Sequence, residues 1–298
     1  MSGTRLGVGR IAALGIALAL CAVLPMAGEA RAGMYAVAQC GWGIGADAEW
    51  ADTTGGAKFR SDGWCVPPPG ADPFDGVHLK SLTRDGQGTV SGTRFARWRW
   101  VVPAGAGITA VRGTWWHALH DGIEQRLGAG VNGAFEPFRT ATATDTALRD
   151  FSIGFPAPVP WFEDRLLCAR AEAKWCSLDP GSWSSVRALT FTVEDDHAPD
   201  VGIGGDLLAG GWRKGNQGVV VWSADMGAGL RFGESFLDGT RIGFTELGCA
   251  KALIGGQWEA TAMRPCPPEV AAQQGVNTTV FGDGLHQALA CSVDFAGN

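Results

Sequence analysis

The segment that decides the fold reads Phe95-Ala96-Arg97-Trp98-Arg99-Trp100-Val101-Val102. Its even-numbered positions are apolar, whereas two of the odd-numbered positions carry arginine. A period of two is typical of a β-strand with one buried and one solvated face. The segment therefore predicts a strand that turns Trp98 and Trp100 into a core and turns Arg97 and Arg99 outward.

Similar strand patterns recur along the chain and are separated by turns. Further strands are predicted over residues 108–116, 186–193, 218–224 and 285–295. Turn chemistry occurs at Asp225-Met226-Gly227-Ala228-Gly229, Asp238-Gly239 and Gly282-Asp283-Gly284. Beyond the N-terminal segment, no helix-period stretch is long enough to supply the crossover helices of a parallel α/β sheet. The sequence predicts an all-β protein.

Residues 1–32 have the parts of a secretory signal peptide. Arg5 and Arg10 precede an apolar run over residues 11–22, and Ala30-Arg31-Ala32 offers a cleavage site before Gly33. An uncleaved membrane anchor is the alternative interpretation. We therefore expect a secreted or cell-surface protein that does not insert into the membrane once the signal is removed.

The composition limits the partners and the number of domains. The chain has 298 residues and a formal net charge of -6, which becomes about -8 without the signal peptide. An acidic chain without a basic cluster argues against nucleic acid as a partner. Its length favours two domains. The polar stretch from Glu194 to Pro199 divides them, so we predict one domain over residues 33–197 and another over 198–298.

Seven cysteines remain after signal removal, which suits an oxidising compartment. Their spacing suggests three local disulfides, Cys40–Cys65, Cys168–Cys176 and Cys249–Cys266, although spacing alone does not fix the connectivity. Zinc binding is the weaker alternative, because no C-x-x-C pair occurs. Cys291 is predicted to be the unpaired cysteine, buried on one face of the last strand with Leu289, Val293 and Phe295.

Several short motifs resemble those of secreted actinobacterial surface-type proteins. In the first domain these are Gln39-Cys40 and Trp98-x-Trp100-x-x-Pro103. In the second they are Gly210-Gly211-Trp212, Ser223-Ala224-Asp225, Asp238-Gly239, Asp283-Gly284-Leu285-His286 and Asp294-Phe295-Ala296-Gly297-Asn298. The resemblance implies a jelly-roll-like, concanavalin A-like sandwich followed by an immunoglobulin-like sandwich. Further repeats often follow in such proteins, which leaves open both a fragment and a released protein.

The candidate ligand-binding residues are Trp115, Trp116, His120 and Asp121. Adjacent tryptophans on a strand face opposite sides, so one indole is available to pack on a sugar ring while polar neighbours bind its hydroxyl groups. The alternative is that a core and a loop cover both indoles. His117, His120, Asp121 and Glu124 could hold a metal, but strand geometry points the two histidines apart. We predict no metal site and no cofactor.

Catalytic patterns are weak. Glycoside hydrolysis needs two acids about 5 to 9.5 Å apart across a cleft. Glu194-Asp195-Asp196 lies at a strand end, and Glu163-Asp164 is expected in a loop. The chain has no G-x-S-x-G, H-E-x-x-H or P-loop motif. We therefore expect a non-catalytic surface or binding protein for an extracellular glycan or cell-envelope component. A secreted carbohydrate-active hydrolase and a structural spacer are the alternatives.

Overall fold

The computed structural model describes residues 33–54, 58–61, 65, 76–81, 88–178 and 181–298. These residues form β-strands and no α-helix, with two short 3-10 turns, η1 (Asp206–Leu208) and η2 (Thr278–Val280). The all-β prediction is confirmed. None of the described helical turns has the length and apolar character needed to cross a membrane.

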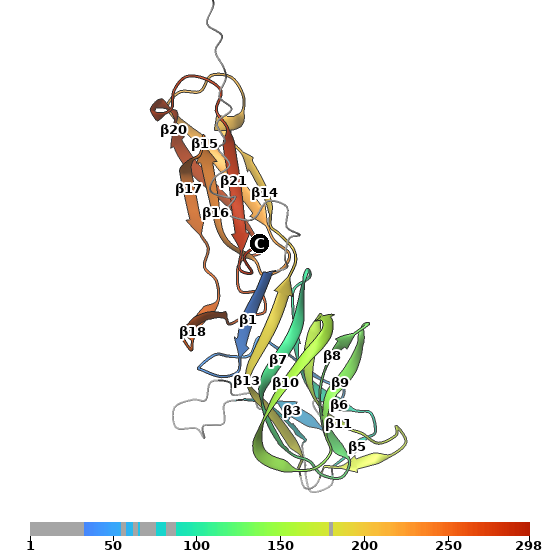
Figure 1. Cartoon of the computed structure of the whole chain (residues 1–298). Helices are drawn as coiled ribbons and strands as arrows, with labels where there is room; N and C mark the ends of the chain where they lie inside the picture. The colour runs from blue at the N-terminus through green and yellow to red at the C-terminus, as the bar shows by residue number, and fades with distance from the viewer. Residues whose placement is uncertain (1–32, 55–57, 62–64, 66–75, 82–87, 179–180) are drawn as a thin grey trace, which may run out of the picture.

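The larger sheet of the N-terminal part has eight strands. Most of it lies in the lower half of Figure 1. Six of them lie in the order β10 (Asp145–Val159), β7 (Ala106–Ala118), β13 (Trp183–Asp195), β1 (Gly33–Gln39), β19 (Gln257–Ala260) and β18 (Lys251–Ile254). The other two are β4 (Val77–Ser81), which pairs with β13, and β3 (Phe59–Ser61), which pairs with β4. Strand β13 is central, because β7, β1 and β4 all pair with it.

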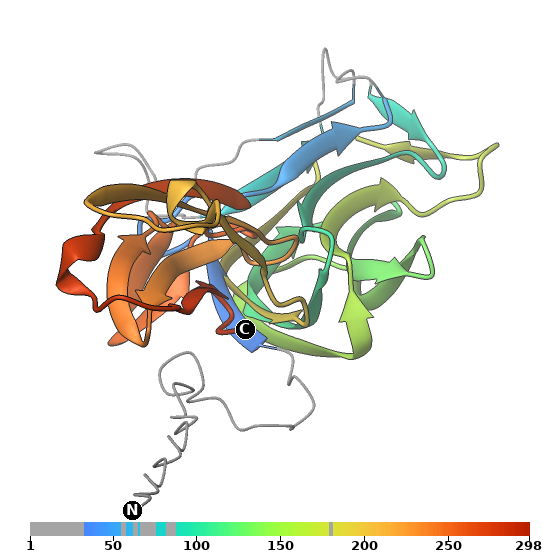
Figure 2. The same ribbon diagram turned by 90° about the horizontal axis from the view of Figure 1, so that it is seen from above.

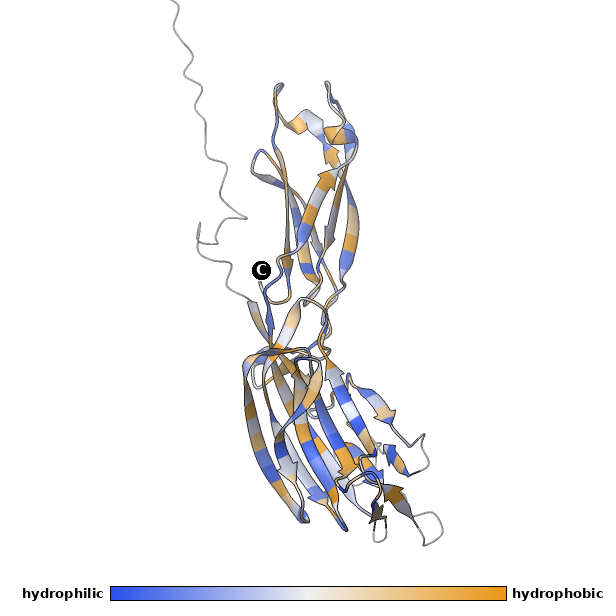
Figure 3. Ribbon diagram, turned by 90° about the vertical axis from the view of Figure 1, so that its right-hand side faces the viewer, coloured by the Kyte–Doolittle hydropathy of each residue, from blue (hydrophilic) through white to orange (hydrophobic). Residues whose placement is uncertain are grey.

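The second sheet of the N-terminal part has five strands. Their order is β2 (Glu49–Asp52), β6 (Phe95–Val101), β11 (Trp161–Cys168), β8 (Ile123–Val131) and β9 (Ala134–Ala141). A separate ribbon pairs β12 (Trp175–Ser177) with β5 (Thr89–Ser91). Hydrophilic and hydrophobic residues alternate along many of these strands (Figure 3), as expected where a sheet has one buried face.

The core of the N-terminal part lies between these two sheets. Trp100 and Phe162 of the five-stranded sheet contact Phe191 of the larger sheet, with ring centroids 5.7 and 5.8 Å away. All three rings are fully buried, and burial of a side chain of this size contributes on the order of 2 kcal/mol. Trp98 is half-buried and packs against the same core. The predicted strand and the inward direction of both tryptophans are confirmed.

The C-terminal part contains two three-stranded sheets. One has the order β14 (Asp200–Gly204), β15 (Asn216–Ala224), β20 (Glu269–Asn277), and the other β17 (Thr240–Glu246), β16 (Leu230–Leu237), β21 (Ala288–Asp294). Their buried apolar residues form a small core of Val219, Val221, Leu237 and Val276. In Figure 2 this part, in orange and red, lies beside the blue and green strands of the N-terminal part.

A hairpin of the C-terminal part completes the larger N-terminal sheet. Strands β18 and β19 pair with each other, and Ala260 pairs in parallel with Val37 of β1. The Tyr35 hydroxyl donates a hydrogen bond of 2.9 Å to the carbonyl oxygen of Met263, and Gln39 Nε2 donates one of 2.9 Å to that of Thr261. The hairpin therefore crosses the boundary that the sequence predicts at residue 197.

The cysteines confirm one prediction and correct another. The structure contains Cys40–Cys65, Cys168–Cys176 and Cys249–Cys266, as the spacing suggests. The prediction that Cys291 is an unpaired buried thiol is wrong, because no described cysteine is free. The predicted burial is wrong as well, because β21 turns Ala288 and Ala290 to the core, whereas Leu289, on the same side as Cys291, is 44% exposed and Cys291 is half-buried.

The Cys249–Cys266 disulfide closes the base of the β18–β19 hairpin across 17 residues. We expect the double substitution Cys249→Ser, Cys266→Ser to lower the free energy of unfolding by about 3 kcal/mol. The cross-link closes a loop of this length in the unfolded chain, and its removal raises the entropy of the unfolded chain. Hydrogen exchange measured by mass spectrometry should accelerate more over residues 251–260 than in β7. Equal protection of the hairpin in both proteins would contradict this.

Candidate functional site

The outer side of the five-stranded sheet carries a group of arginines and aromatic rings that we name the arginine–aromatic face. Alternation along β6 places Arg97 and Arg99 opposite to the half-buried Trp98 and the buried Trp100. The register sets Glu163 of β11 beside Arg99, and Arg165 beside Arg97 and Arg126. The face consists of Phe95, Arg97, Arg99, Arg126, Phe135, Trp161, Glu163 and Arg165.

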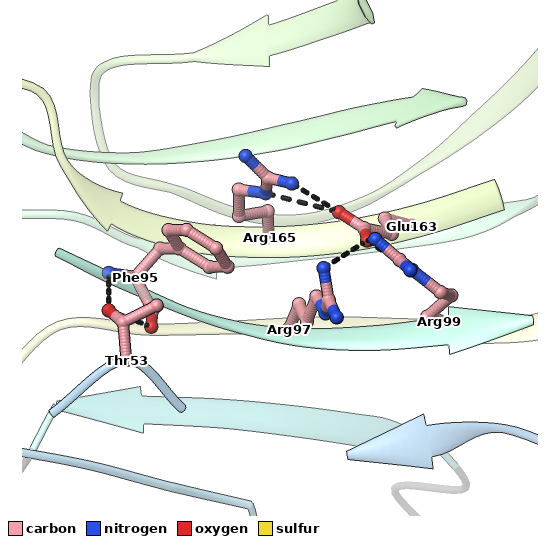
Figure 4. A network of polar contacts seen from close by, with 6 residues as sticks. All are labelled: Thr53, Phe95, Arg97, Arg99, Glu163 and Arg165. Atoms are coloured by element: carbon pink, nitrogen blue, oxygen red, sulfur yellow. Dashed lines mark hydrogen bonds and ion pairs between the residues drawn. The ribbon is translucent and has the colours of Figure 1, made fainter. Parts of the chain in front are cut away.

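Glu163 is the centre of this face and is fully buried beneath three guanidinium groups (Figure 4). Its Oε1 accepts hydrogen bonds from Arg97 Nη1 at 2.9 Å and Arg99 Nε at 2.5 Å. Its Oε2 accepts two from Arg165, at 3.1 Å from Nε and 2.6 Å from Nη2. Because the carboxylate is shared, its charge cannot neutralise all three cations.

Aromatic rings separate and support the guanidinium groups. Arg99 Cζ lies 4.2 Å from the ring centroid of Trp161, and Trp161 stacks with Phe135 at 6.3 Å and an interplanar angle of 5°. Arg165 Cζ lies 3.7 Å from the centroid of Phe135 and 4.1 Å from that of Phe95. Stacking holds the planar groups in fixed positions and leaves their edges available for hydrogen bonds.

The face has more hydrogen-bond donors than its own carboxylate can use. Each guanidinium has about five N–H donors, whereas one carboxylate offers about four acceptor positions. Arg97 Nε is buried and has no partner among the described residues. The arginine side chains are 14–22% exposed, so part of each remains open to solvent. The arrangement can bind an anionic group, with the rings as apolar neighbours.

The prediction that Glu163-Asp164 lies in a loop is wrong, because both residues are in the middle of β11. Their burial hides the alternating pattern, since the arginines cover the outward Glu163 while Asp164 lies inside the sandwich. Gln125 Nε2 donates a hydrogen bond of 2.8 Å to Asp164 Oδ1. Neighbours on a strand face opposite sides, so this pair cannot flank one glycosidic bond.

The residues that the sequence selects as a binding site are engaged in contacts within the fold. Trp116 is 4% exposed and packs against Trp183, and Trp115 is half-buried and packs on the core. Asp121 pairs with Arg170 at 2.5 Å and accepts a hydrogen bond from the backbone N–H of Ser177. The backbone N–H of His120 donates to Ser182 Oγ at 2.9 Å. The buried indole of Trp116 corresponds to the alternative that the core covers it, and whether the other three residues bind a ligand stays a prediction.

A second concave region lies among the loops of the C-terminal part. Its cavity of about 890 Å³ is lined by the loop from Leu207 to Lys214 and by the segment around η2. Trp212 is 83% exposed there, and Arg213, Lys214 and His286 also line it. Sequence reasoning used Gly210-Gly211-Trp212 only as a resemblance motif, because an exposed indole in a loop has no periodic signal.

No family model matches the chain, and no curated protein matches it. The K2 cleaved adhesin domain of Lys-gingipain is 8% identical with a TM-score of 0.32, over 53% of this chain and 97% of that chain. The apo form of BiXyn10A CBM1 is 8% identical with a TM-score of 0.26, over 55% and 92%. The glycoside hydrolase domain of Endo-D from Streptococcus pneumoniae R6 is 9% identical with a TM-score of 0.27, over 89% and 44%. Likenesses at this level carry no argument about function.

Removal of the central carboxylate should destabilise the N-terminal part. In Glu163→Gln, three guanidinium groups lose their buried counter-charge, so we expect the free energy of unfolding to fall by about 3 kcal/mol. The matched control is Glu124→Gln, which removes a more exposed pair with Arg126 and should cost less than about 1 kcal/mol. Urea unfolding measures both. Equal losses in the two variants would contradict a central role for Glu163.

Asp164 makes stability depend on pH. Burial raises the pKa of Asp164 to about 7, against the smaller effect of the hydrogen bond from Gln125. Between about pH 4 and pH 7 the unfolded chain releases a proton that the folded protein retains, so the free energy of unfolding falls as the pH rises.

In the variant Asp164→Asn, the free energy of unfolding should not show the part of the fall with rising pH that Asp164 causes. That part amounts to at most roughly 4 kcal/mol. Urea unfolding of both proteins from pH 4 to pH 8 measures the difference, which isolates Asp164 from the other acidic groups. Parallel pH profiles would show that Asp164 does not titrate in this range.

Proposed function

We propose that this is an exported, non-catalytic binding protein whose arginine–aromatic face recognises an acidic carbohydrate outside the cell. The proposed architecture is a jelly-roll-like, concanavalin A-like sandwich that carries the face, followed by an immunoglobulin-like sandwich. The observation that supports the proposal is the excess of guanidinium donors around Glu163.

The chemistry of the face favours an acidic sugar over a neutral one. A carboxylate or sulfate on a sugar ring can accept paired hydrogen bonds from the edge of a guanidinium group. The apolar side of the same ring can lie against the edges of Trp161 or Phe135, whose ring faces carry Arg99 and Arg165. The chain as a whole has a net negative charge, so anions are attracted mainly to the surface that carries the clustered arginines.

The signal-peptide pattern and three disulfides are compatible with an extracytoplasmic location. A hydrolase remains the alternative reading of a carbohydrate site, but Glu163 is occupied by three arginines and Asp164 faces the core. The C-terminal cavity is a second candidate site, because an exposed indole beside cationic side chains also suits a sugar.

The test is binding of residues 33–298 to an array of acidic and neutral glycans. We expect acidic polymers to bind, and Arg97→Gln to weaken that binding at least about tenfold, which corresponds to about 1.4 kcal/mol. This variant keeps the paired hydrogen bonds between Arg165 and Glu163. The matched control is Arg241→Gln, which removes an exposed arginine of the C-terminal part and should bind like the parent.

Two results would contradict the proposal. Binding to neutral glycans alone would remove the role of the arginines. Loss of binding in Trp212→Ala, with Arg97→Gln unaffected, would move the site to the C-terminal cavity.

A further inference from the structure

Three aspartates meet at the junction of the two parts of the chain. Asp195 ends β13, Asp225 follows β15, and Asp294 ends β21. They are 0%, 5% and 0% exposed. One carboxylate oxygen from each lies within 4.8 Å of the others. Three carboxylates gathered out of water repel one another unless a positive charge compensates them.

The surrounding chain supplies neutral donors to these carboxylates. Asp195 accepts hydrogen bonds from the backbone N–H groups of His197 and Ala228, at 3.1 and 2.5 Å. Asp225 Oδ2 accepts one of 2.6 Å from the backbone N–H of Gly229. Asp294 Oδ1 accepts two, of 2.6 and 2.8 Å, from the backbone N–H groups of Gly297 and Asn298, and its Oδ2 accepts one of 2.9 Å from Asn298 Nδ2. These bonds fix the orientation of the carboxylates without adding a cation.

One oxygen of the cluster lacks any partner. Asp225 Oδ1 is buried and accepts no hydrogen bond from the described residues. The two basic side chains beside the cluster have other partners. The Arg264 guanidinium donates to the carbonyl oxygens of Met226 and Gly227, at 2.9 and 3.3 Å, and His197 Nδ1 pairs with Asp196 at 2.7 Å. A buried carboxylate oxygen without a partner is rare in folded proteins and calls for a ligand.

We propose that Asp195, Asp225 and Asp294 bind one Ca²⁺ ion at this junction. Calcium takes six to eight oxygen ligands at about 2.3–2.6 Å, so two ligands on opposite sides of one ion lie about 4.8 Å apart. The spacing of the three carboxylates fits within that limit. Magnesium retains several waters and needs near-ideal octahedral geometry, which suits this closed site less well. Zinc prefers nitrogen and sulfur ligands, and this cluster offers only oxygen.

The ion would connect segments that are distant in the sequence. Asp195 belongs to the central strand of the larger sheet, whereas Asp225 and Asp294 belong to the two sheets of the C-terminal part. Ca²⁺ therefore holds the C-terminal part against the end of β13. The site is separate from the arginine–aromatic face, so it does not depend on the proposed carbohydrate.

The test uses the full chain at neutral pH, with calorimetric titration of CaCl₂ and thermal unfolding in EDTA or millimolar Ca²⁺. We expect one binding site and a rise in Tm of roughly 5 °C or more in saturating Ca²⁺. Asp225→Asn should lose both the heat of binding and the rise in Tm. In EDTA this variant should unfold at the same temperature as the parent or higher, because the substitution removes one of three carboxylates that repel one another.

The matched control is Asp283→Asn, an exposed aspartate in a loop of the C-terminal part, which should respond to Ca²⁺ like the parent. If Asp225→Asn fails to fold, Asp294→Asn takes its place with the same expectation. Superimposable melting curves in EDTA and Ca²⁺ would overturn the proposal. An equal response in Asp225→Asn and the parent would do the same, and a response to Mg²⁺ but not Ca²⁺ would overturn the choice of ion.

Discussion

Both parts of the protein depend on the pairing of β13. This strand hydrogen-bonds to β7, β1 and β4, so it holds together the N-terminal sheet that forms one wall of the core. The same strand carries Phe191 into that core and ends in Asp195 at the junction. Because three strands pair with this one, its loss would open the core of the N-terminal part and leave β1 and the attached β18–β19 hairpin without their partner.

The protein buries charge in two different ways. The charge of Glu163 is compensated within the fold, because alternation and register place three arginines around its carboxylate. The surplus positive charge stays near the surface, where solvent or an anion can meet it. The junction has the opposite composition, with three buried acids and only neutral donors in direct contact. A buried charge is costly unless it is paired, so the partners proposed for the two sites are of opposite sign.

The parts of the fold that sequence predicts are those set by local pattern. Alternation in Phe95–Val102 identifies β6 and the side that Trp100 faces, and short spacings identify the three disulfides. What local pattern misses depends on distant partners. The sequence places Glu163 in a loop, because the pairing of its carboxylate with Arg97 and Arg99 is not visible in local pattern. The pairing of the β18–β19 hairpin with β1 is likewise not visible in the periodicity of the sequence. The aspartates of the junction come from three segments, so no spacing reveals them.

The way in which the parts are joined leaves the arginine–aromatic face clear. The C-terminal hairpin extends the larger sheet through β1, and no described strand of the C-terminal part pairs with the five-stranded sheet. The face therefore lies on the sheet that the joint does not extend. A rigid joint at β13 and β1 would fix the direction of this face relative to the C-terminal part, whereas a loose one would let it turn. The joint and the proposed binding face thus lie on different sheets of the N-terminal part, so binding at the face leaves the pairing of β1 with β19 undisturbed.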